Sequence, residues 1–515
     1  MISISNLTTL LSFPCLCLIF LSISFYVYLR ATISHHTWKK RGIPLLDPVP
    51  VFGQWEFSRI FHESYFEIIN RLYEDARSKG LKYCCIFQFS TPTLMLLDPQ
   101  IIGSILTKDF AYFSDRFDLY YDETQAISQQ LFSVSTADWK ELSKRVSPVV
   151  SPGRIGYLVQ DMENLDKDVI FNDVPSVVST DQFAFKFNQM VMGLASLGSD
   201  LARNASSMLN SVKHMIDKSF YNFFIFYTPL VLPSWRKSFF PKIDDEELCS
   251  MVRNVSMSRE KYGDYRNDVF QFYMDAQSKQ EKRYKKSSSS NSSFDVDIIT
   301  VARRLFWFLM DSQGTSTVAL SFVLHLISLH PECQENIKQE LEQVMEERGE
   351  QEVTYSVVRD LKYTHTVIKE CLRLYTPMSV LQRVCTRDYL LPGSSVVIPK
   401  GTKVIIPIYS IQRDPQYFPE PFEFRPVRFH DVTKIAPYTF MPFGEGPRFC
   451  IGYRFAMAHL KYTIATLVSK FHIEAASTKQ NILALHPFSP AILRSKKEIM
   501  VRFRKRFSKS EESVT

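Results

Sequence analysis

The chain has 515 residues, of which 45% are apolar and 22% are charged, and its formal net charge is +7. This is the balance of an ordinary globular protein, long enough for one very large domain or two to four smaller ones. Because the positive charge is spread along the chain, it predicts no nucleic-acid partner. Nine cysteines without a C-x-x-C pair or a regular spacing argue against a disulfide framework and a structural zinc site.

Residues 1–30 are predicted to be an N-terminal membrane anchor. No charged residue precedes Arg30, and the almost wholly apolar run 7–29 is long enough to cross a bilayer as one helix. A cleaved signal peptide would begin with basic residues, whereas the positive charge here follows the apolar run. The positive-inside rule then predicts that the N-terminus lies outside the cytosol and that the rest of the chain lies inside it.

Residues 31–55 are predicted to be a basic, proline-rich hinge, stiff enough to hold the following domain at a fixed angle to the membrane. From residue 56 to residue 510 the apolar periodicity is mainly helical, most clearly at 66–76 and 298–329. Strand-like pieces are short and lie at 84–89, 404–408 and 499–503. The pattern predicts one mainly α domain with small β-sheets.

Residues 220–232 hold six aromatic side chains, and Trp235, Phe239 and Phe240 follow them. The segment is too short to span a bilayer. It is therefore predicted to be either a buried helix end or a patch that dips into the membrane interface, and the sequence leaves both open.

The ten residues 443–452 carry the strongest chemical signal. They begin with Phe443 and Gly444, and two glycines and a proline within four residues predict a tight turn whose N–H groups point at the Cys450 sulfur. The helical pattern that follows places Cys450 at a helix N-terminus, where the dipole and the unpaired amides stabilise a thiolate. Gly452 leaves room beside the cysteine for a flat ligand. A thiolate held in this way pushes electron density onto a haem iron and favours splitting of an O–O bond.

These ten residues, followed by Ala456, resemble the haem-binding signature of the cytochrome P450 family. The resemblance extends over essentially the whole chain. Segments 38–44, 384–389 and 414–418 are similar to those of animal microsomal members, which include insect detoxification and vertebrate drug-oxidising enzymes. It implies the cytochrome P450 fold, with haem (iron-protoporphyrin IX) as the cofactor and Cys450 as the iron ligand.

Glu370 and Arg373 lie three residues apart on one face of a predicted helix, an arrangement that alone is more often a weak surface salt bridge. The resemblance implies that this pair binds Arg428 in the Pro-x-Arg-Phe segment 426–429. The trio is expected to support the haem pocket and to take no part in the chemistry.

The resemblance also implies cationic or N–H partners for the haem propionates. These are Trp139, Arg383 and Arg448, with Arg116 as a fourth. Family members usually carry an arginine four residues after the tryptophan, but this chain has Ser143 there. The basic residues at 144 and 145 point about 100° and 200° further round a helix, so this chain departs from the family at one propionate contact.

The helix that crosses the distal face of the haem also departs from the family pattern of two small residues, any residue, an acid and threonine. Here Thr315 is kept, Gly314 replaces the acid, and Asp311 replaces the first small residue. Asp311 and Thr315 are four residues apart and share a helix face. One hypothesis is that Asp311, with a raised pKa, replaces the missing acid in delivering protons to bound dioxygen. The other is that Asp311 crowds or repels substrate and that turnover is slow or lost.

The resemblance implies a monooxygenase that inserts one oxygen atom of O2 into a lipophilic small molecule. NADPH–cytochrome P450 reductase would supply the electrons and dock through Lys461 and Arg454, and cytochrome b5 is a second implied partner. Membrane lipid is a further partner, because the location is expected to be the endoplasmic reticulum membrane with the catalytic domain on the cytosolic face. The substrate pocket is expected between the distal helix and segments 117–132, 220–232 and 487–489, which are largely apolar.

Two other functions stay open. Loss of the usual acid could be tolerated by a haem-thiolate isomerase or dehydratase that rearranges a peroxide without a reductase. A haem-binding protein without turnover, which sequesters ligands, belongs to a different class. NADPH and O2 consumption with reductase, peroxide conversion without NADPH, or ligand-induced spectral shifts without product would distinguish the three.

Overall fold

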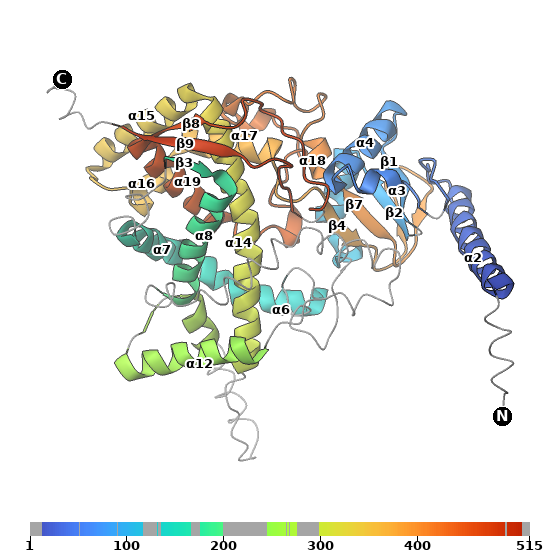
Figure 1. Cartoon of the computed structure of the whole chain (residues 1–515), viewed down its shortest axis with the longest axis horizontal. Helices are drawn as coiled ribbons and strands as arrows, with labels where there is room; N and C mark the ends of the chain where they lie inside the picture. Colours follow the sequence, from blue (N-terminus) through green and yellow to red (C-terminus); the bar gives the residue numbers. More distant parts are fainter. Residues whose placement is uncertain are drawn as a thin grey trace, which may run out of the picture.

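The computed structural model is shown in Figure 1. It describes residues 13–50, 52–89, 91–116, 131, 135–165, 176–198, 245–263, 265–266, 268–275, 298–489 and 492–506. The predicted pocket segment 117–132, apart from residue 131, and the whole aromatic segment 220–232 lie outside these described residues.

A 32-residue helix, α14 (Ile298–Leu329), runs through the helical part of the molecule (Figure 1). All positions from 318 to 328 are buried. They are buried because α8 (Thr180–Leu197), α17 (Lys362–Leu374) and α19 (Tyr453–Lys470) pack against this helix. A helix that is apolar all round needs such complete cover.

The other described helices are shorter than α14. They are α2 (Phe13–Lys40), α3 (Phe57–Ile60), α4 (Tyr65–Ser78), α5 (Pro99–Gly103), α6 (Thr136–Val146), α7 (Pro152–Leu165), α12 (Asp245–Tyr262), α15 (Pro331–Arg348), α16 (Tyr355–Asp360) and α18 (Ile408–Ile411). Helix α4 shows how local sequence sets a start: Ser64 accepts from the Glu67 N–H while the Glu67 carboxylate accepts from the Ser64 N–H.

Within the described residues, three small sheets complete the fold. One has four strands in the order β1 (Tyr83–Gln88), β2 (Thr91–Leu96), β7 (Lys403–Ile406) and β4 (Leu381–Val384), in which only β2 and β7 run parallel. A second has the order β3 (Val177–Ser179), β9 (Met500–Lys505) and β8 (Phe471–Ala475). The third pairs β5 (Tyr389–Leu390) with β6 (Val397–Ile398). Register places Arg383 of β4 opposite Val404 of β7.

The prediction of a mainly α protein with small sheets is confirmed. The helical stretch 66–76 lies in α4, and 298–329 coincides with α14. The three predicted strands correspond to β1, β7 and β9 within one or two residues at each end. Strands β3, β5 and β6 escaped prediction because pairs of two or three residues leave no alternating pattern, and the longer strands β2, β4 and β8 were missed as well.

Helix α2 differs from its predicted extent, since it continues ten residues past position 30 into the expected hinge. It is followed by Gly42, which has a positive φ of 73°, and the extended chain of the proline-rich stretch comes after it. Within the residues that the structure describes, no helix has both the length and the apolar character needed to cross a membrane. The predicted run 7–29 begins before the first described residue.

Candidate functional site

The loop before α19 is closed by short backbone contacts. The Cys450 N–H donates to the Phe443 carbonyl at 2.9 Å, and the Gly444 N–H donates to the Met441 carbonyl at 3.0 Å. Gly446 has a φ of 73°, and a Cβ there would lie 2.0 Å from the Leu106 carbonyl oxygen. This position therefore accepts glycine alone, because the loop packs directly on the backbone at residue 106.

The Cys450 sulfur lies where α19 begins, since Gly452 is the residue that precedes the first turn. Burial raises the pKa of the Cys450 thiol, while hydrogen bonds from the backbone N–H groups of Gly452 and Tyr453 act to lower it. A Cβ on Gly452 would lie 3.9 Å from the sulfur. Cys450 thus lies at a helix N-terminus as predicted, but the N–H groups that act on its sulfur come from Gly452 and Tyr453 and not from the preceding turn.

Two charged residues from distant parts of the chain act on the same thiol. Arg116 lowers the pKa of Cys450, and Asp311 of α14 raises it. Cys450 is exposed, and its thiol lies close enough to Arg116 and Asp311 for their charges to act on its pKa. The distal helix and the cysteine loop therefore lie near each other.

Three arginines are clustered near the cysteine loop. Burial lowers the pKa of Arg116 to about 10 and that of Arg448 to about 9, and Arg116 and Arg448 also lower the pKa of the buried Arg383. Arg116 donates to the Arg448 carbonyl at 3.3 Å, and the Arg448 guanidinium lies 4.4 Å from the centre of the Trp139 ring. The structure thus brings together the four side chains predicted to contact propionates.

Such a cluster of buried cations requires anionic ligands to be stable. The Arg383 Nε has no hydrogen-bond partner among the described residues, and its Nη1 donates only to the neighbouring Gln382 carbonyl at 2.8 Å. The donor set therefore fits the two carboxylates of haem. Ser143 of α6 takes no part, because its hydroxyl donates to the Lys140 carbonyl of its own helix.

The predicted supporting trio forms a network in which Glu370 and Arg373 are fully buried and Arg428 is partly buried. Arg373 donates to both carboxylate oxygens of Glu370 at 2.8 Å, and Arg428 donates to Glu370 Oε1 at 3.2 Å. Neither Glu370 nor Arg373 has exposed side-chain surface. Arg373 also donates to the carbonyls of Gln412 and Pro421. The network ties α17 to the segments that precede the cysteine loop.

Gln412 is a structural residue that sequence reasoning missed. Its Nε2 donates to the carbonyls of Leu372 and Arg373 at 3.0 and 3.1 Å, and its Oε1 accepts from the Met441 N–H at 3.1 Å. One amide therefore joins the end of α17 to the start of the cysteine loop. No sequence pattern distinguishes this glutamine from one on the surface.

On the distal side, Thr315 donates its hydroxyl proton to the Asp311 backbone carbonyl at 2.8 Å. Gln313 turns away from this face, since it is buried and donates to the Phe185 carbonyl of α8. Gly314 is buried as well. Asp311, whose charge acts on the pKa of Cys450, and Thr315 therefore lie on the same face of this turn of α14.

The prediction that Lys461 docks a reductase is wrong. Lys461 is buried, and its Nζ donates to the carbonyls of Val358 and Arg359 at the end of α16. Burial lowers the pKa of this amine to about 8. Arg454, the other predicted docking residue, is exposed. The sequence did not show that α16 covers this face of α19.

Comparison with known proteins gives the same assignment along nearly the whole chain. The family model "Cytochrome P450" matches residues 43–503. The chain is 28% identical to Cytochrome P450 6j1 of Blattella germanica, covering 91% of this chain and 93% of that protein. It is 29% identical to Cytochrome P450 9e2 of the same species, and the match covers 88% of this chain and 92% of that protein. It is 26% identical to Cytochrome P450 6a2 of Drosophila melanogaster, covering 90% and 94%.

Proposed function

Because the chain belongs to the cytochrome P450 family, whose members are haem-binding monooxygenases, we propose that Cys450 is the thiolate that binds its haem iron. The observation that carries this proposal is the position of the sulfur, at the start of α19 with the N–H groups of Gly452 and Tyr453 directed at it. A thiolate needs such donors, because burial alone would keep the thiol protonated. When bound, haem supplies the oxygen-activating chemistry.

Cys450→Ser is the direct test. The reduced carbon monoxide complex of the wild type is expected to show the red-shifted Soret band of a thiolate-ligated haem, and the variant is expected to lose it. Cys17→Ser is a matched control, because Cys17 is exposed on α2, and it should keep the band. Retention of the band in Cys450→Ser would mean that another residue binds the iron.

We also propose that Arg116, Arg383, Arg448 and Trp139 hold the propionates. Their support is the position of the three guanidinium groups beside one another, where burial lowers the pKa of each, and the buried Arg383 Nε, which has no hydrogen-bond partner among the described residues. Arg383→Met should lower haem retention, measured as the rate of haem transfer to apomyoglobin. Arg425→Met is the control, because Arg425 is half exposed and pairs with the exposed Glu420. Equal haem loss from both variants would contradict the assignment.

For the distal side we propose that Asp311 holds the proton that the family's usual acid would supply. The Asp311 carboxylate acts on the pKa of both Cys450 and Arg116, so it lies near the sulfur. The Thr315 hydroxyl donates to the helix backbone, which leaves its oxygen able to accept a hydrogen bond from water. The two groups share one helix face and can pass a proton through such a water.

Asp311→Ala and Asp311→Asn test this role with the reductase-reconstituted enzyme. Both are expected to lower product formed per NADPH about 10- to 100-fold and to release more hydrogen peroxide. Ser312→Ala is the neighbouring control, since its hydroxyl donates to the Phe308 carbonyl of its own helix. Unchanged or faster turnover in Asp311→Ala would favour the opposing hypothesis, that this carboxylate crowds or repels substrate.

We further propose a lipophilic substrate, electrons from NADPH–cytochrome P450 reductase with cytochrome b5 as a second partner, and attachment to the endoplasmic reticulum membrane. Large apolar side chains on α2 support the membrane attachment, because Leu18, Leu21 and Phe25 are each 61–63% exposed. The anchor 1–30, the hinge 31–55 and the haem domain 56–510 are part of this proposal. Cell fractionation of the full chain and of a chain starting at residue 41 tests the membrane attachment. Equal recovery of the two chains in the membrane fraction would contradict it.

A reductase-independent isomerase or dehydratase is the second candidate. The observation that favours it is Gly314, which is buried at the position of the family's acid and can hold no proton. Conversion of a lipid hydroperoxide without NADPH would support this function. NADPH-dependent product formation that requires reductase would exclude it.

A further inference from the structure

A cavity with a volume of about 390 Å³ lies between α7, α8, α14, α19 and the residues Arg266, Asp268 and Val269. Neither Cys450 nor Thr315 nor any of the three clustered arginines lines it. The volume is within the roughly 300–1,000 Å³ typical of small-molecule sites. This cavity is therefore separate from the site described above and large enough for a ligand of its own.

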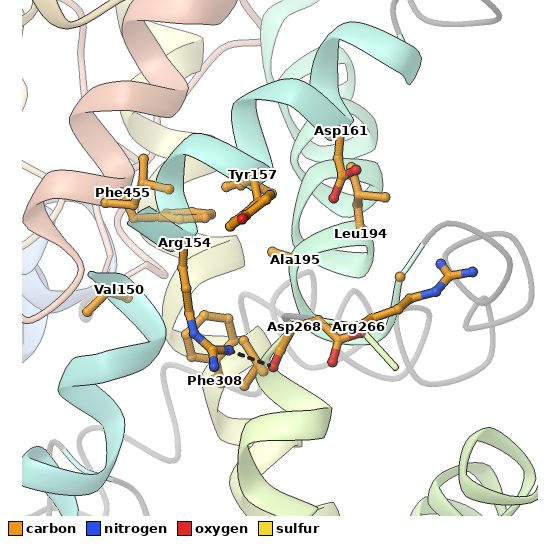
Figure 2. Close-up of a pocket in the computed structure, with 14 residues that line it drawn as sticks. Val150, Arg154, Tyr157, Asp161, Leu194, Ala195, Arg266, Asp268, Phe308 and Phe455 are labelled. Carbon is orange, nitrogen blue, oxygen red and sulfur yellow. Dashed lines mark hydrogen bonds between the residues drawn. The ribbon is translucent and has the colours of Figure 1, made fainter. Parts of the chain in front are cut away.

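The wall of the cavity exposes polar and apolar surface in about equal parts, and helices supply its large apolar side chains. Leu158 comes from α7, Leu194 from α8, Phe308 from α14 and Phe455 from α19. Figure 2 shows Arg154, Tyr157, Phe308 and Phe455 among the side chains that line the cavity. Such a wall favours a ligand with an apolar body, since burying that body against these side chains removes both from water.

Two arginines and two aspartates line the cavity, and they differ in whether a group of opposite charge lies beside them. Asp268 is paired with Arg259, which donates to Asp268 Oδ1 at 3.1 Å and also contacts Oδ2. Asp161 has a compensating cation, because Arg266 lowers its pKa although burial raises it overall. Arg154 differs from both: its Nη1 donates to the Asp268 backbone carbonyl at 3.3 Å. No carboxylate among the described residues lies within ion-pair distance of it.

Arg154 is nevertheless held in place. Its guanidinium lies 5.6 Å from the centre of the Phe272 ring, and the bond to the Asp268 carbonyl, drawn dashed in Figure 2, fixes its direction. A fixed, half-buried guanidinium without a carboxylate partner is a preformed anion site, because its remaining N–H groups match the two oxygens of a carboxylate.

We propose that this cavity binds a lipophilic carboxylate, with the carboxylate paired to Arg154 and the apolar body lying against Leu158, Leu194 and Phe455. The ligand is additional to the substrate at the haem. Ala195 lines the same cavity from α8, so a larger side chain there would occupy the space of the apolar body.

Equilibrium dialysis of the full-length holoenzyme with labelled decanoate tests the proposal. The haem site is first saturated with an azole that binds the iron, so that decanoate cannot be counted there. One equivalent of decanoate is expected to bind. Arg154→Gln is expected to weaken binding about ten-fold or more, as for loss of a charge-assisted hydrogen bond. Decanol, which lacks the charge, should bind the wild type as weakly as decanoate binds this variant.

Ala195→Phe should also abolish decanoate binding, by filling the cavity, whereas Arg502→Gln should not, because Arg502 is 57% exposed on β9 and does not line the cavity. The carbon monoxide spectrum of each variant, recorded apart from the binding measurement, checks that the protein is folded and that the thiolate binds the iron. No binding in the presence of the azole, or equal affinities of wild type and Arg154→Gln, overturns the proposal. Either outcome leaves the role of Cys450 unaffected.

Discussion

The cysteine side and the distal side of the haem site are built differently. Around Cys450 the loop is closed by backbone hydrogen bonds, and the buried Glu370 carboxylate accepts four, from Arg373, Arg428 and the Arg425 N–H. On the distal side, Thr315 bonds only to the backbone of its own helix. The first side is fixed by tertiary contacts and follows the family pattern. The second is set by the order of side chains along one helix, which can change without changing the fold.

Glu370→Gln is expected to have the largest effect and would test the rigid side of this comparison. It leaves the Arg373 guanidinium buried without its counter-charge, which typically costs about 3–5 kcal/mol. Urea unfolding of the haem-loaded protein measures this loss of stability. Glu63→Gln is the control, since Glu63 belongs to a partly exposed pair with Arg59 and should cost about 1 kcal/mol or less. Similar losses in both variants would show that the trio does not stabilise the fold.

Gly446→Ala is expected to have the next largest effect on stability. The positive φ and the Cβ placed 2.0 Å from the Leu106 carbonyl oxygen are expected to cost about 3 kcal/mol and to displace the cysteine loop. Gly401→Ala separates the two causes, because Gly401 also has a positive φ but nothing lies within 4 Å of its Cβ position. It should cost about 1 kcal/mol. Thermal unfolding compares them, and equal shifts would rule out the close approach as a cause.

His459 gives a pH test on the helix that carries the cysteine. Burial lowers its pKa to about 3, and neither ring nitrogen has a hydrogen-bond partner among the described residues. Below pH 6.5 the unfolded chain binds a proton that the native state does not, so stability is lost as pH falls toward 3. The slope from this group is about 1.4 kcal/mol per pH unit.

His459→Phe is expected to reduce that slope by about one proton between pH 6 and 4. Part of the slope should remain, because burial also lowers the pKa of His365 to about 4. Urea unfolding at several pH values measures the slopes. An unchanged slope would mean that His459 is protonated in the folded protein.

Asp311→Asn should have the smallest effect on stability, within about 0.5 kcal/mol, because Asp311 is exposed and the two side chains have nearly the same shape. Asp268→Asn is the contrasting control, since it breaks a buried pair with Arg259. Thermal unfolding measures both. A large loss from Asp311→Asn would show that the distal side is as rigidly held as the cysteine side.

Much of this arrangement was predictable from sequence. Helix α14 has a long apolar pattern, and the residues around Cys450 combine turn, glycine and helix signals, so both were located correctly. The pairing of Glu370 with Arg428 required the family resemblance, because two residues 58 positions apart share no local pattern.

Other features could not be predicted from the sequence, because they depend on contacts that form only when distant segments pack together. Gln412 acts through three backbone groups that the fold alone brings together. Lys461 was misjudged, since its basic character suggests a surface position and only the packing of α16 shows that it is buried. The Arg154 cavity depends on five separate segments meeting, and none of them carries a binding motif.

Helix α2 has one further consequence. His35 lies 4.3 Å from the Phe87 ring of β1, and Trp38 is buried, so the C-terminal end of the helix is fixed in rotation against the four-stranded sheet. The helix continues unbroken from there to Phe13. Each residue inserted or deleted between these points would turn the outer end by about 100° and move it by about 1.5 Å. The length of α2 therefore sets the direction in which the apolar face of its N-terminal part points, relative to the four-stranded sheet.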